Sequence, residues 1–251
     1  MKTILVPYHH AEPLPVLAQA YHADEAVVVS KGPPGAMLAR LYAQVATLVA
    51  SQVEPVAVVS GDCTASLATV AGLQHRGIEP GIVWIDAHPD FHTPKTTRSG
   101  DLSGMALAIL TGRTGMRLRD EIGLGTVPED ACALAGVREI DPGEREAIEH
   151  AAIRRLTLTE LADAALPAAP WYVQLDVDVL DPDGLPPLRS PVPGGPSVEV
   201  LADALRALAA RGTIAAFGLG CTFTPKGLAQ PDALATIRPL IDAAMRTARN
   251  A

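Results

Sequence analysis

The chain has 251 residues, 48% hydrophobic and 19% charged, so it can bury a large core and is not expected to be disordered. Its formal net charge of −8 argues against nucleic acid or an anionic membrane surface as a partner. Its three cysteines, Cys63, Cys132 and Cys221, show no CxxC spacing and favour free thiols in a reducing compartment, so we expect a cytoplasmic protein.

Short apolar runs alternate with helical patterns along the chain. The apolar runs predict strands at Thr3–Pro7, Glu25–Val29, Val56–Ser60, Ile82–Ile85, Ala131–Val137, Ile153–Leu156, Trp171–Leu175 and Ile214–Leu219. The helical patterns lie at Ala36–Ser51, Ala65–Arg76, Ser103–Thr111, Pro142–Ala152, Val198–Arg211 and Asp232–Arg249. This alternation predicts an α/β fold, with a mostly parallel sheet of about eight strands between two helical layers, in one domain over residues 1–251.

Residues of metal-ligand type follow three of these strands, at the sheet edge where ligands bind in parallel sheets. They are Cys63 in VVSGDCTAS, Asp86, His88 and Asp90 in WIDAHPDFHTP, and Asp176 and Asp178 in VQLDVDVLDP. A spacing of two residues puts such side chains on one face of an extended backbone. Either motif alone is typical of a turn or a cap. Together they favour a divalent-metal site, because four buried carboxylates need counter-charge, and carboxylates with one imidazole suit Mn²⁺.

DAHPD followed by LDVDVLDP is similar to the paired metal-binding signatures of the arginase, agmatinase and formimidoylglutamase family. The resemblance implies a hydrolase with two Mn²⁺ per chain that cleaves a C–N bond of a guanidino or hydroxyguanidino amino acid. It implies that Asp86 and Asp176 bridge both metals, that Asp90 completes one, and that His88 and Asp178 complete the other. A metal-bridging hydroxide, oriented by Asp90, would attack the guanidinium carbon.

Two further segments resemble parts of the family that bind substrate. TTRSGDLSG resembles the substrate loop, where Ser99 would contact a substrate carboxylate. AGVREIDPGE resembles the segment that binds the substrate's α-amino group and places Asp141 there. Asp-Pro is also a good helix start, so Asp141 as the N-cap of the following helix stays open.

Four positions depart from the family pattern. Cys63 replaces a histidine at the first metal position, and His92 replaces an asparagine. Ser103 replaces the catalytic histidine of the substrate loop, and Thr222 replaces an acid that pairs with the guanidinium. We interpret Cys63 as a ligand, with core filling as the alternative. Family members that cleave N-hydroxyarginine resemble this chain at Cys63 and in lacking the loop histidine.

Two alternatives stay open beside a guanidino hydrolase. One is hydrolysis of another amide or a formimidoyl group at the same site. The other is a catalytically silent member that binds a ligand or a protein, although a silent protein has no reason to keep four mutually repelling carboxylates. His9 and His10 follow the first predicted strand and could line the cleft, but we favour surface positions for them. We expect a small-molecule substrate and regard a homo-oligomer as compatible with the sequence.

Overall fold

Eight parallel strands form one sheet in the order β4-β1-β5-β10-β9-β6-β7-β8 in the computed structural model, which describes residues 2–230 and 233–245. The strands are β1 (Lys2–Val6), β4 (Glu25–Ala26), β5 (Val56–Ser60), β6 (Gly81–Ile85), β7 (Cys132–Ala135), β8 (Arg154–Leu156), β9 (Trp171–Asp176) and β10 (Ile214–Gly220). Each overlaps a predicted strand, so the predicted fold class is confirmed. A separate antiparallel pair, β2 (Tyr8–His9) and β3 (Glu12–Pro13), follows β1.

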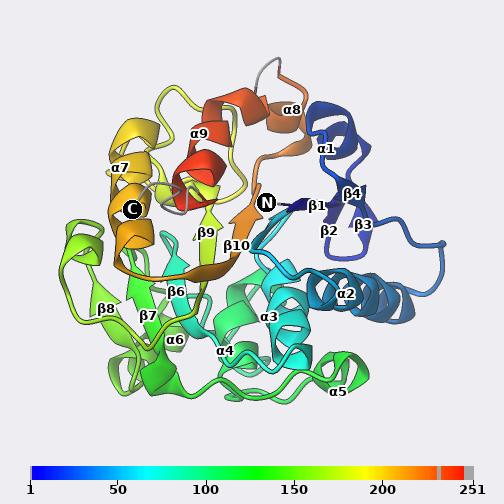
Figure 1. Cartoon of the computed structure of the whole chain (residues 1–251), viewed down its shortest axis with the longest axis horizontal. Helices are drawn as coiled ribbons and strands as arrows, with labels where there is room; N and C mark the ends of the chain where they lie inside the picture. The colour runs from blue at the N-terminus through cyan, green and yellow to red at the C-terminus, as the bar shows by residue number, and fades with distance from the viewer. Residues whose placement is uncertain (1, 231–232, 246–251) are drawn as a thin grey trace.

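Helices connect the strands and cover both faces of the sheet (Figure 1). The α-helices are α1 (Pro15–Ala20), α2 (Pro34–Ala50), α3 (Ala65–His75), α4 (Ala106–Leu110), α5 (Arg117–Ile122), α6 (Pro142–Glu149), α7 (Val198–Arg211), α8 (Pro225–Leu228) and α9 (Ala233–Met245). The 3₁₀ turns are η1 (Ser103–Met105), η2 (Glu129–Ala131), η3 (Thr159–Ala162) and η4 (Val177–Val179). In the part of the chain that the structure describes, no helix is both long and apolar enough to cross a membrane.

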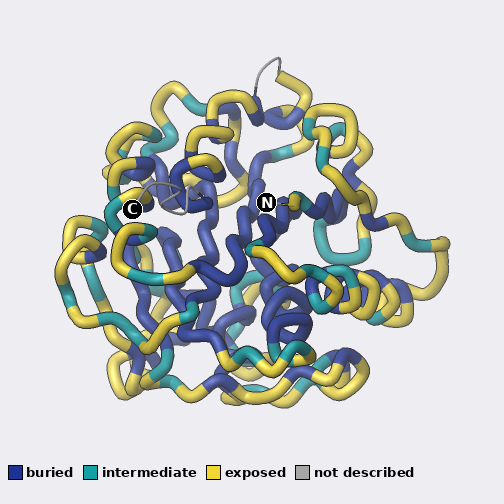
Figure 2. The backbone as a smooth tube through the Cα atoms, viewed as in Figure 1, coloured by how far each residue is buried: buried dark blue, intermediate teal, exposed yellow. Residues whose placement is uncertain are grey.

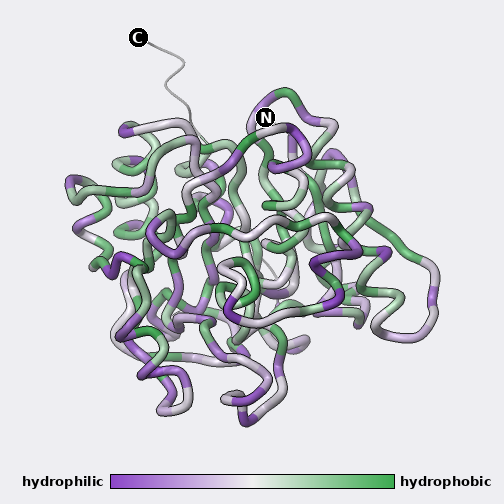
Figure 3. The backbone as a smooth tube through the Cα atoms, turned by 90° about the horizontal axis from the view of Figure 1, so that it is seen from below, coloured by the Kyte–Doolittle hydropathy of each residue, from purple (hydrophilic) through white to green (hydrophobic). Residues whose placement is uncertain are grey.

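Alternate residues of each central strand enter two separate cores. In β5, Val56 and Val58 pack with helices α2 to α6, whereas Ala57 and Val59 pack with α1, α7, α8 and α9. This follows from the two-residue period of a strand and explains why the central strands are apolar throughout. The buried backbone forms the middle of the molecule in Figure 2, and in Figure 3 hydrophobic segments run through the interior while hydrophilic ones gather at the periphery.

Several boundaries differ from the predicted ones. The strand predicted at Glu25–Val29 has only two residues, and the helix predicted at Ser103–Thr111 begins as the 3₁₀ turn η1. The helix predicted at Asp232–Arg249 spans Ala233–Met245, and its predicted ends lie outside the described residues. Helices α1, α5 and α8 were not predicted, because four to six residues carry too little periodicity to detect.

The strand order brings together the four strand ends that carry candidate site residues. Strands β5, β10, β9 and β6 are consecutive in the sheet although they are far apart in the sequence. Because all four are parallel, their carboxyl ends meet at one edge, where ligands bind in such sheets.

Candidate metal centre and pocket

Two of these strands end in the same local structure. The Asp86 carboxylate, directly after β6, accepts a hydrogen bond from the His88 backbone N–H at 2.8 Å. The Asp176 carboxylate, at the end of β9, accepts one from the Asp178 N–H at 2.9 Å, which starts η4. The ligands therefore converge through Asx-type turns, and the predicted extended backbone is wrong at these positions. The two-residue spacing still matters, because an Asx turn bonds to the residue two positions on.

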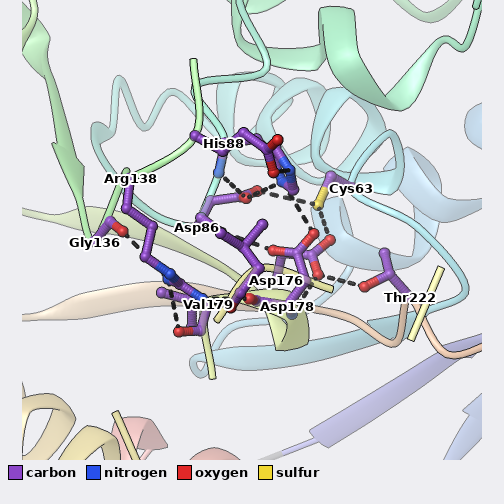
Figure 4. A network of polar contacts seen from close by, with 12 residues as sticks. Cys63, Asp86, His88, Gly136, Arg138, Asp176, Asp178, Val179 and Thr222 are labelled. Atoms are coloured by element: carbon purple, nitrogen blue, oxygen red, sulfur yellow. Dashed lines mark hydrogen bonds and ion pairs between the residues drawn. The ribbon is translucent and has the colours of Figure 1, made fainter. Parts of the chain in front are cut away.

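The side chains form two groups that share Asp86. Ligand atoms of Cys63, Asp86 and Asp90 lie within 4.8 Å of one another, and so do those of Asp86, His88 and Asp178. In Figure 4 the side chains of Cys63, Asp86, His88 and Asp178 point toward one another from the turn after β5 and from the ends of β6 and β9. His88 Nδ1 lies 3.1 Å from Asp178 Oδ2 and 3.5 Å from Asp86 Oδ1.

Asp176 joins the cluster through Cys63 and Thr222. The Cys63 thiol donates to Asp176 Oδ2 at 2.8 Å, and the Thr222 hydroxyl donates to Asp176 Oδ1. Thr222 follows β10, so it lies at the same edge of the sheet as Asp176. A Cβ at Gly220 would lie 3.1 Å from both Asp176 Oδ2 and Cys63 Sγ, so the absence of a side chain there makes room for the cluster.

The cluster concentrates negative charge away from water. Burial, reinforced by Asp178, raises the pKa of Asp176 to about 8, and burial, reinforced by Asp86, raises the pKa of Asp178 to about 7. Burial and the neighbouring carboxylates also raise the pKa of the Cys63 thiol well above its usual range. Burial opposes protonation of His88, but its hydrogen bonds to Asp178 and Asp86 prevail and raise its pKa to about 12.

Asp90 is the side chain that most clearly needs an additional partner. Its Oδ2 is buried and has no hydrogen-bond donor, and burial beside Asp86 raises its pKa well above the usual value. Its φ of 48° lies in the left-handed region, which aspartate tolerates better than most residues. The Asp90 carbonyl accepts from Leu107 and Ala108 at the start of α4, which holds this strained conformation in place. An orphaned, buried carboxylate oxygen in an acidic cluster fits a divalent cation.

All predicted site residues line one pocket of about 420 Å³. They are Cys63, Asp86, His88, Asp90, His92, Ser99, Ser103, Asp141, Asp176, Asp178 and Thr222. The metal-type ligands form its floor at the strand ends, and the loop between β6 and α4 forms one wall. The structure thus brings together residues that 159 sequence positions separate, from Cys63 to Thr222.

The substrate-type residues of this wall are held by local contacts. His92 Nε2 lies 3.3 Å from Asp141 Oδ2, and His92 Nδ1 lies 3.1 Å from the Thr96 hydroxyl. Asp141 is the N-cap of α6 and forms a capping box with Glu144, so the predicted cap is confirmed. Ser103 donates to Asp101 at 2.7 Å, which ties it into the loop.

Sequence reasoning missed several residues of the site. The interpretation of His9 as a surface residue is wrong, because its side chain is only 13% exposed and lines the pocket. His9 faces the buried Asp62, which the sequence analysis did not single out. The sequence signal was the position of His9 three residues after the end of β1, a strand of the same parallel sheet. Cys221, also near the site, is fully buried and does not line the pocket, so it belongs to the core.

Arg138 was also missed, and it supports the floor of the pocket. Its guanidinium donates to the backbone carbonyls of Asp178, Val179 and Val192 at 3.1, 3.0 and 2.6 Å. Figure 4 shows Arg138 beside Val179. These bonds fasten the long segment after β9 against the turn that carries Asp178. No short motif could have revealed this role, because all the acceptors are backbone atoms.

Comparisons with known proteins agree with this geometry. The model of the arginase family matches residues 7–220. Over 157 residues the chain is 36% identical to an arginase of Brucella melitensis, covering 54% of this chain and 50% of that protein. Over 132 residues it is 39% identical to an N(omega)-hydroxy-L-arginine amidinohydrolase of Streptomyces lavendulae, covering 51% and 46%. The chain thus spans about half the length of the curated relatives it matches.

Solved structures show the same fold. The arginase of Bacillus cereus superimposes with a TM-score of 0.81 at 21% identity, covering 97% of this chain and 96% of that one. The Entamoeba histolytica arginase, in complex with L-ornithine, superimposes with a TM-score of 0.79 at 20% identity, covering 97% of both chains.

Proposed function

The chain belongs to the arginase family, and from this premise we propose that it is a metal-dependent hydrolase of C–N bonds in guanidino amino acids. The observation that carries the proposal is the pair of ligand groups that share Asp86 inside the pocket. The named relatives, arginases and a hydroxyarginine amidinohydrolase, support this class of reaction.

We assign two divalent cations, Mn²⁺, to the cluster. Cys63 and Asp90 would hold one, His88 and Asp178 the other, and Asp86 with Asp176 would contact both. Four carboxylates carry −4, which two divalent cations balance. Bound there, the cations would supply positive charge and make a water molecule acidic enough to act as a nucleophile near neutral pH. Asp90 Oδ2 is buried without a hydrogen-bond partner, which supports a role for it in accepting a proton and orienting that water.

The wall of the pocket suits an amino acid. Asp141 stands where it can receive an α-amino group, and Ser99 lies on the loop where a substrate carboxylate would bind. Both groups favour arginine-type amino acids over a decarboxylated amine such as agmatine.

The reacting end of the pocket favours a modified guanidine over plain arginine. Thr222 is the neutral residue there, and its hydroxyl is already bonded to Asp176, so it offers no charge to a guanidinium. A guanidinium without a carboxylate partner lacks charge-assisted hydrogen bonds worth about 1.5 to 3 kcal/mol each. An N-hydroxyguanidine is less basic and enters neutral, and it needs less proton donation, which Ser103 cannot supply. We therefore propose N-hydroxyarginine as the preferred substrate type.

The test compares kcat/KM for N-hydroxyarginine, arginine and agmatine with manganese-loaded protein. We expect N-hydroxyarginine to be hydrolysed fastest and agmatine slowest. Asp176→Ala should lose at least one manganese per chain by elemental analysis, whereas Cys132→Ala, a core thiol outside the pocket, should keep both.

Faster turnover of arginine or agmatine would contradict the substrate preference. No turnover of any of the three, with both metals bound, would favour formimidoyl or other amide hydrolysis, or a silent binding protein. Absence of metal after manganese loading would refute the metal centre. The cytoplasmic location, the single domain and a homo-oligomeric state stay predictions.

A further inference from the structure

A second group of metal-type side chains lies at the rim of the pocket, outside the acidic cluster. Ligand atoms of His9, His10 and Asp101 lie within 4.8 Å of one another. His9 ends strand β2, His10 begins the turn of the β2–β3 hairpin, and Asp101 comes from the loop between β6 and η1. His9 and Asp101 also line the main pocket, whereas His10 lines the neighbouring surface.

Two ring nitrogens of this group lack hydrogen bonds. His9 Nδ1 and His10 Nε2 are inaccessible to water, and neither has a hydrogen-bond partner. The two rings stack with centroids 4.3 Å apart. His9 Nδ1 lies 3.3 Å from Asp62 Oδ2, and His10 Nε2 lies 3.2 Å from Asp101 Oδ1. Each nitrogen thus faces a carboxylate oxygen without forming a hydrogen bond. A proton satisfies the His9–Asp62 pair, and a proton or a bound cation satisfies the His10–Asp101 pair.

The two rings are carried by a strained and closely packed segment of backbone. His10 has a φ of 51°, in the left-handed region that a non-glycine residue seldom adopts. Its N–H donates to Asp62 at 2.6 Å, and the Gly61 N–H donates to the Tyr8 carbonyl at 3.0 Å. A Cβ at Gly61 would lie 2.3 Å from that carbonyl oxygen, so the hairpin is packed closely on the end of β5. Strain of this kind persists where the surrounding structure enforces it.

We propose that His9, His10 and Asp101 bind a third divalent cation, of the Zn²⁺ type, beside the acidic metal centre. Two imidazoles and one carboxylate are the donor set of many zinc sites that leave a fourth position to water or a ligand. This set is softer than the acidic cluster, so the two sites differ in the metal they favour. Asp62, behind His9, supplies the carboxylate that commonly orients a ligating histidine.

The surrounding charges accommodate a cation at this place. The carboxylates of Asp62 and Asp101 each lie beside one of the imidazoles, at 3.3 Å from His9 Nδ1 and 3.2 Å from His10 Nε2. Arg189 lines the same surface and opposes a cation, so the two ionised carboxylates must outweigh it.

A cation here would fasten the substrate loop. Asp101 accepts from both the backbone N–H and the hydroxyl of Ser103, and its own N–H donates to Ser99. Binding Asp101 to the histidines of the hairpin would therefore join the loop carrying Ser99 and Ser103 to the N-terminal part of the sheet. The loop would lose mobility, and the rim of the pocket would keep its shape.

The experiment loads the full chain with Mn²⁺, adds Zn²⁺, and measures both metals by elemental analysis after desalting. We expect one zinc in addition to the manganese already bound. His10→Asn, which tolerates the positive φ, and Asp101→Asn should each lose that zinc and keep the manganese. His150→Ala removes an exposed histidine at the end of α6 and should change neither metal. Asp62→Asn should weaken zinc binding about 10- to 100-fold.

X-ray absorption at the zinc edge identifies where the zinc is bound. Nitrogen and oxygen neighbours without sulfur support the proposed site, whereas a zinc–sulfur distance of about 2.3 Å places the zinc at Cys63 in the acidic centre and overturns the proposal. Zinc that enters only by displacing manganese, or that His10→Asn still binds, also overturns it. Asp176→Ala should lose manganese and retain this zinc. The manganese content therefore tests the acidic centre, and the zinc content separately tests the site at His9, His10 and Asp101.

Discussion

Asp86 and Asp176 each use one carboxylate in two ways. One oxygen accepts a backbone N–H and shapes the turn after the strand, and the rest of the carboxylate faces the cluster. The turn therefore orients the carboxylate in advance for the proposed metal. Replacing either aspartate removes a turn as well as a ligand, so an asparagine, which keeps the Asx turn, is the informative substitution.

Cys63 is expected to set the charge of the metal centre. Four carboxylates and two divalent cations cancel, so a thiolate ligand leaves the centre at −1, whereas a neutral histidine leaves it neutral. A more negative centre binds hydroxide less readily and raises the pKa of bound water. Cys63→His should therefore move the pH–rate profile to lower pH. An unchanged profile, with Cys132→Ala as the reference thiol variant, would mean that Cys63 is core filling.

Substitution of Gly220 tests whether metal binding depends on the close packing around Asp176 and Cys63. An added methyl group would lie 3.1 Å from both Asp176 Oδ2 and Cys63 Sγ, so one of them must shift. We expect Gly220→Ala to weaken manganese binding about 10- to 100-fold, the usual effect of disturbing a ligand's support. Gly115→Ala, where a Cβ meets nothing within 4 Å, is the matched control. Equal affinities measured by calorimetric titration of the two variants would contradict this expectation.

At the scale of elements, α6 connects a structural cap with the substrate wall. Asp141 caps the helix through its box with Glu144, and Glu144 also accepts the Phe91 N–H at 3.0 Å, next to Asp90. The start of α6 is thus joined to the turn that carries Asp90. A cap and a substrate contact can coexist at Asp141, because its carboxylate remains about half exposed on the pocket side.

Two substitutions separate these roles. Asp141→Ala should lower the free energy of unfolding by about 1 kcal/mol through loss of the cap, whereas Asp141→Asn should keep most of it. Both should raise KM for an amino-acid substrate, because both remove the charge that would pair with an α-amino group. Denaturant unfolding measures the first effect and steady-state kinetics the second. A wild-type KM in Asp141→Asn would leave Asp141 with the cap alone.

At the scale of the whole molecule, the acidic centre works against the fold when no cation is bound. The pKa values of Asp176 and Asp178, about 8 and about 7, lie above their usual 3.8, so the folded chain binds protons that the unfolded chain does not. Their contribution to stability is present in full below pH ~4 and is lost as pH rises through 7 and 8. Divalent cations replace those protons at higher pH.

Manganese should therefore stabilise the protein more at pH 8 than at pH 6. At saturating metal we expect the melting temperature to rise by about 5 to 10 °C at pH 8 and by less at pH 6. Scanning calorimetry with and without a chelator measures both shifts. Asp178→Asn removes one titrating carboxylate and should reduce the difference between the two pH values; an equal shift at both would exclude proton–metal competition in the cluster.

The sequence by itself determined the layers, the strands and the candidate metal ligands. Apolar β-branched runs such as Val56–Ser60 can only be buried on both faces, which requires helices on either side of a parallel sheet. The motifs around Asp86 and Asp176 were visible because their ligands are close in sequence and their spacing matches a local turn. Such features depend on neighbouring residues alone.

Tertiary structure decided what depends on distant residues. The order β5-β10-β9-β6 brings Thr222 to Asp176, and the hairpin after β1 places His9 against Asp62 and His10 beside Asp101. The six-carbonyl environment of Arg138 likewise arises from the fold of the segment after β9. These pairs could not be predicted from local sequence, because their members are far apart in the chain. The packing of the two helical layers onto the sheet determines which strand ends and loops meet.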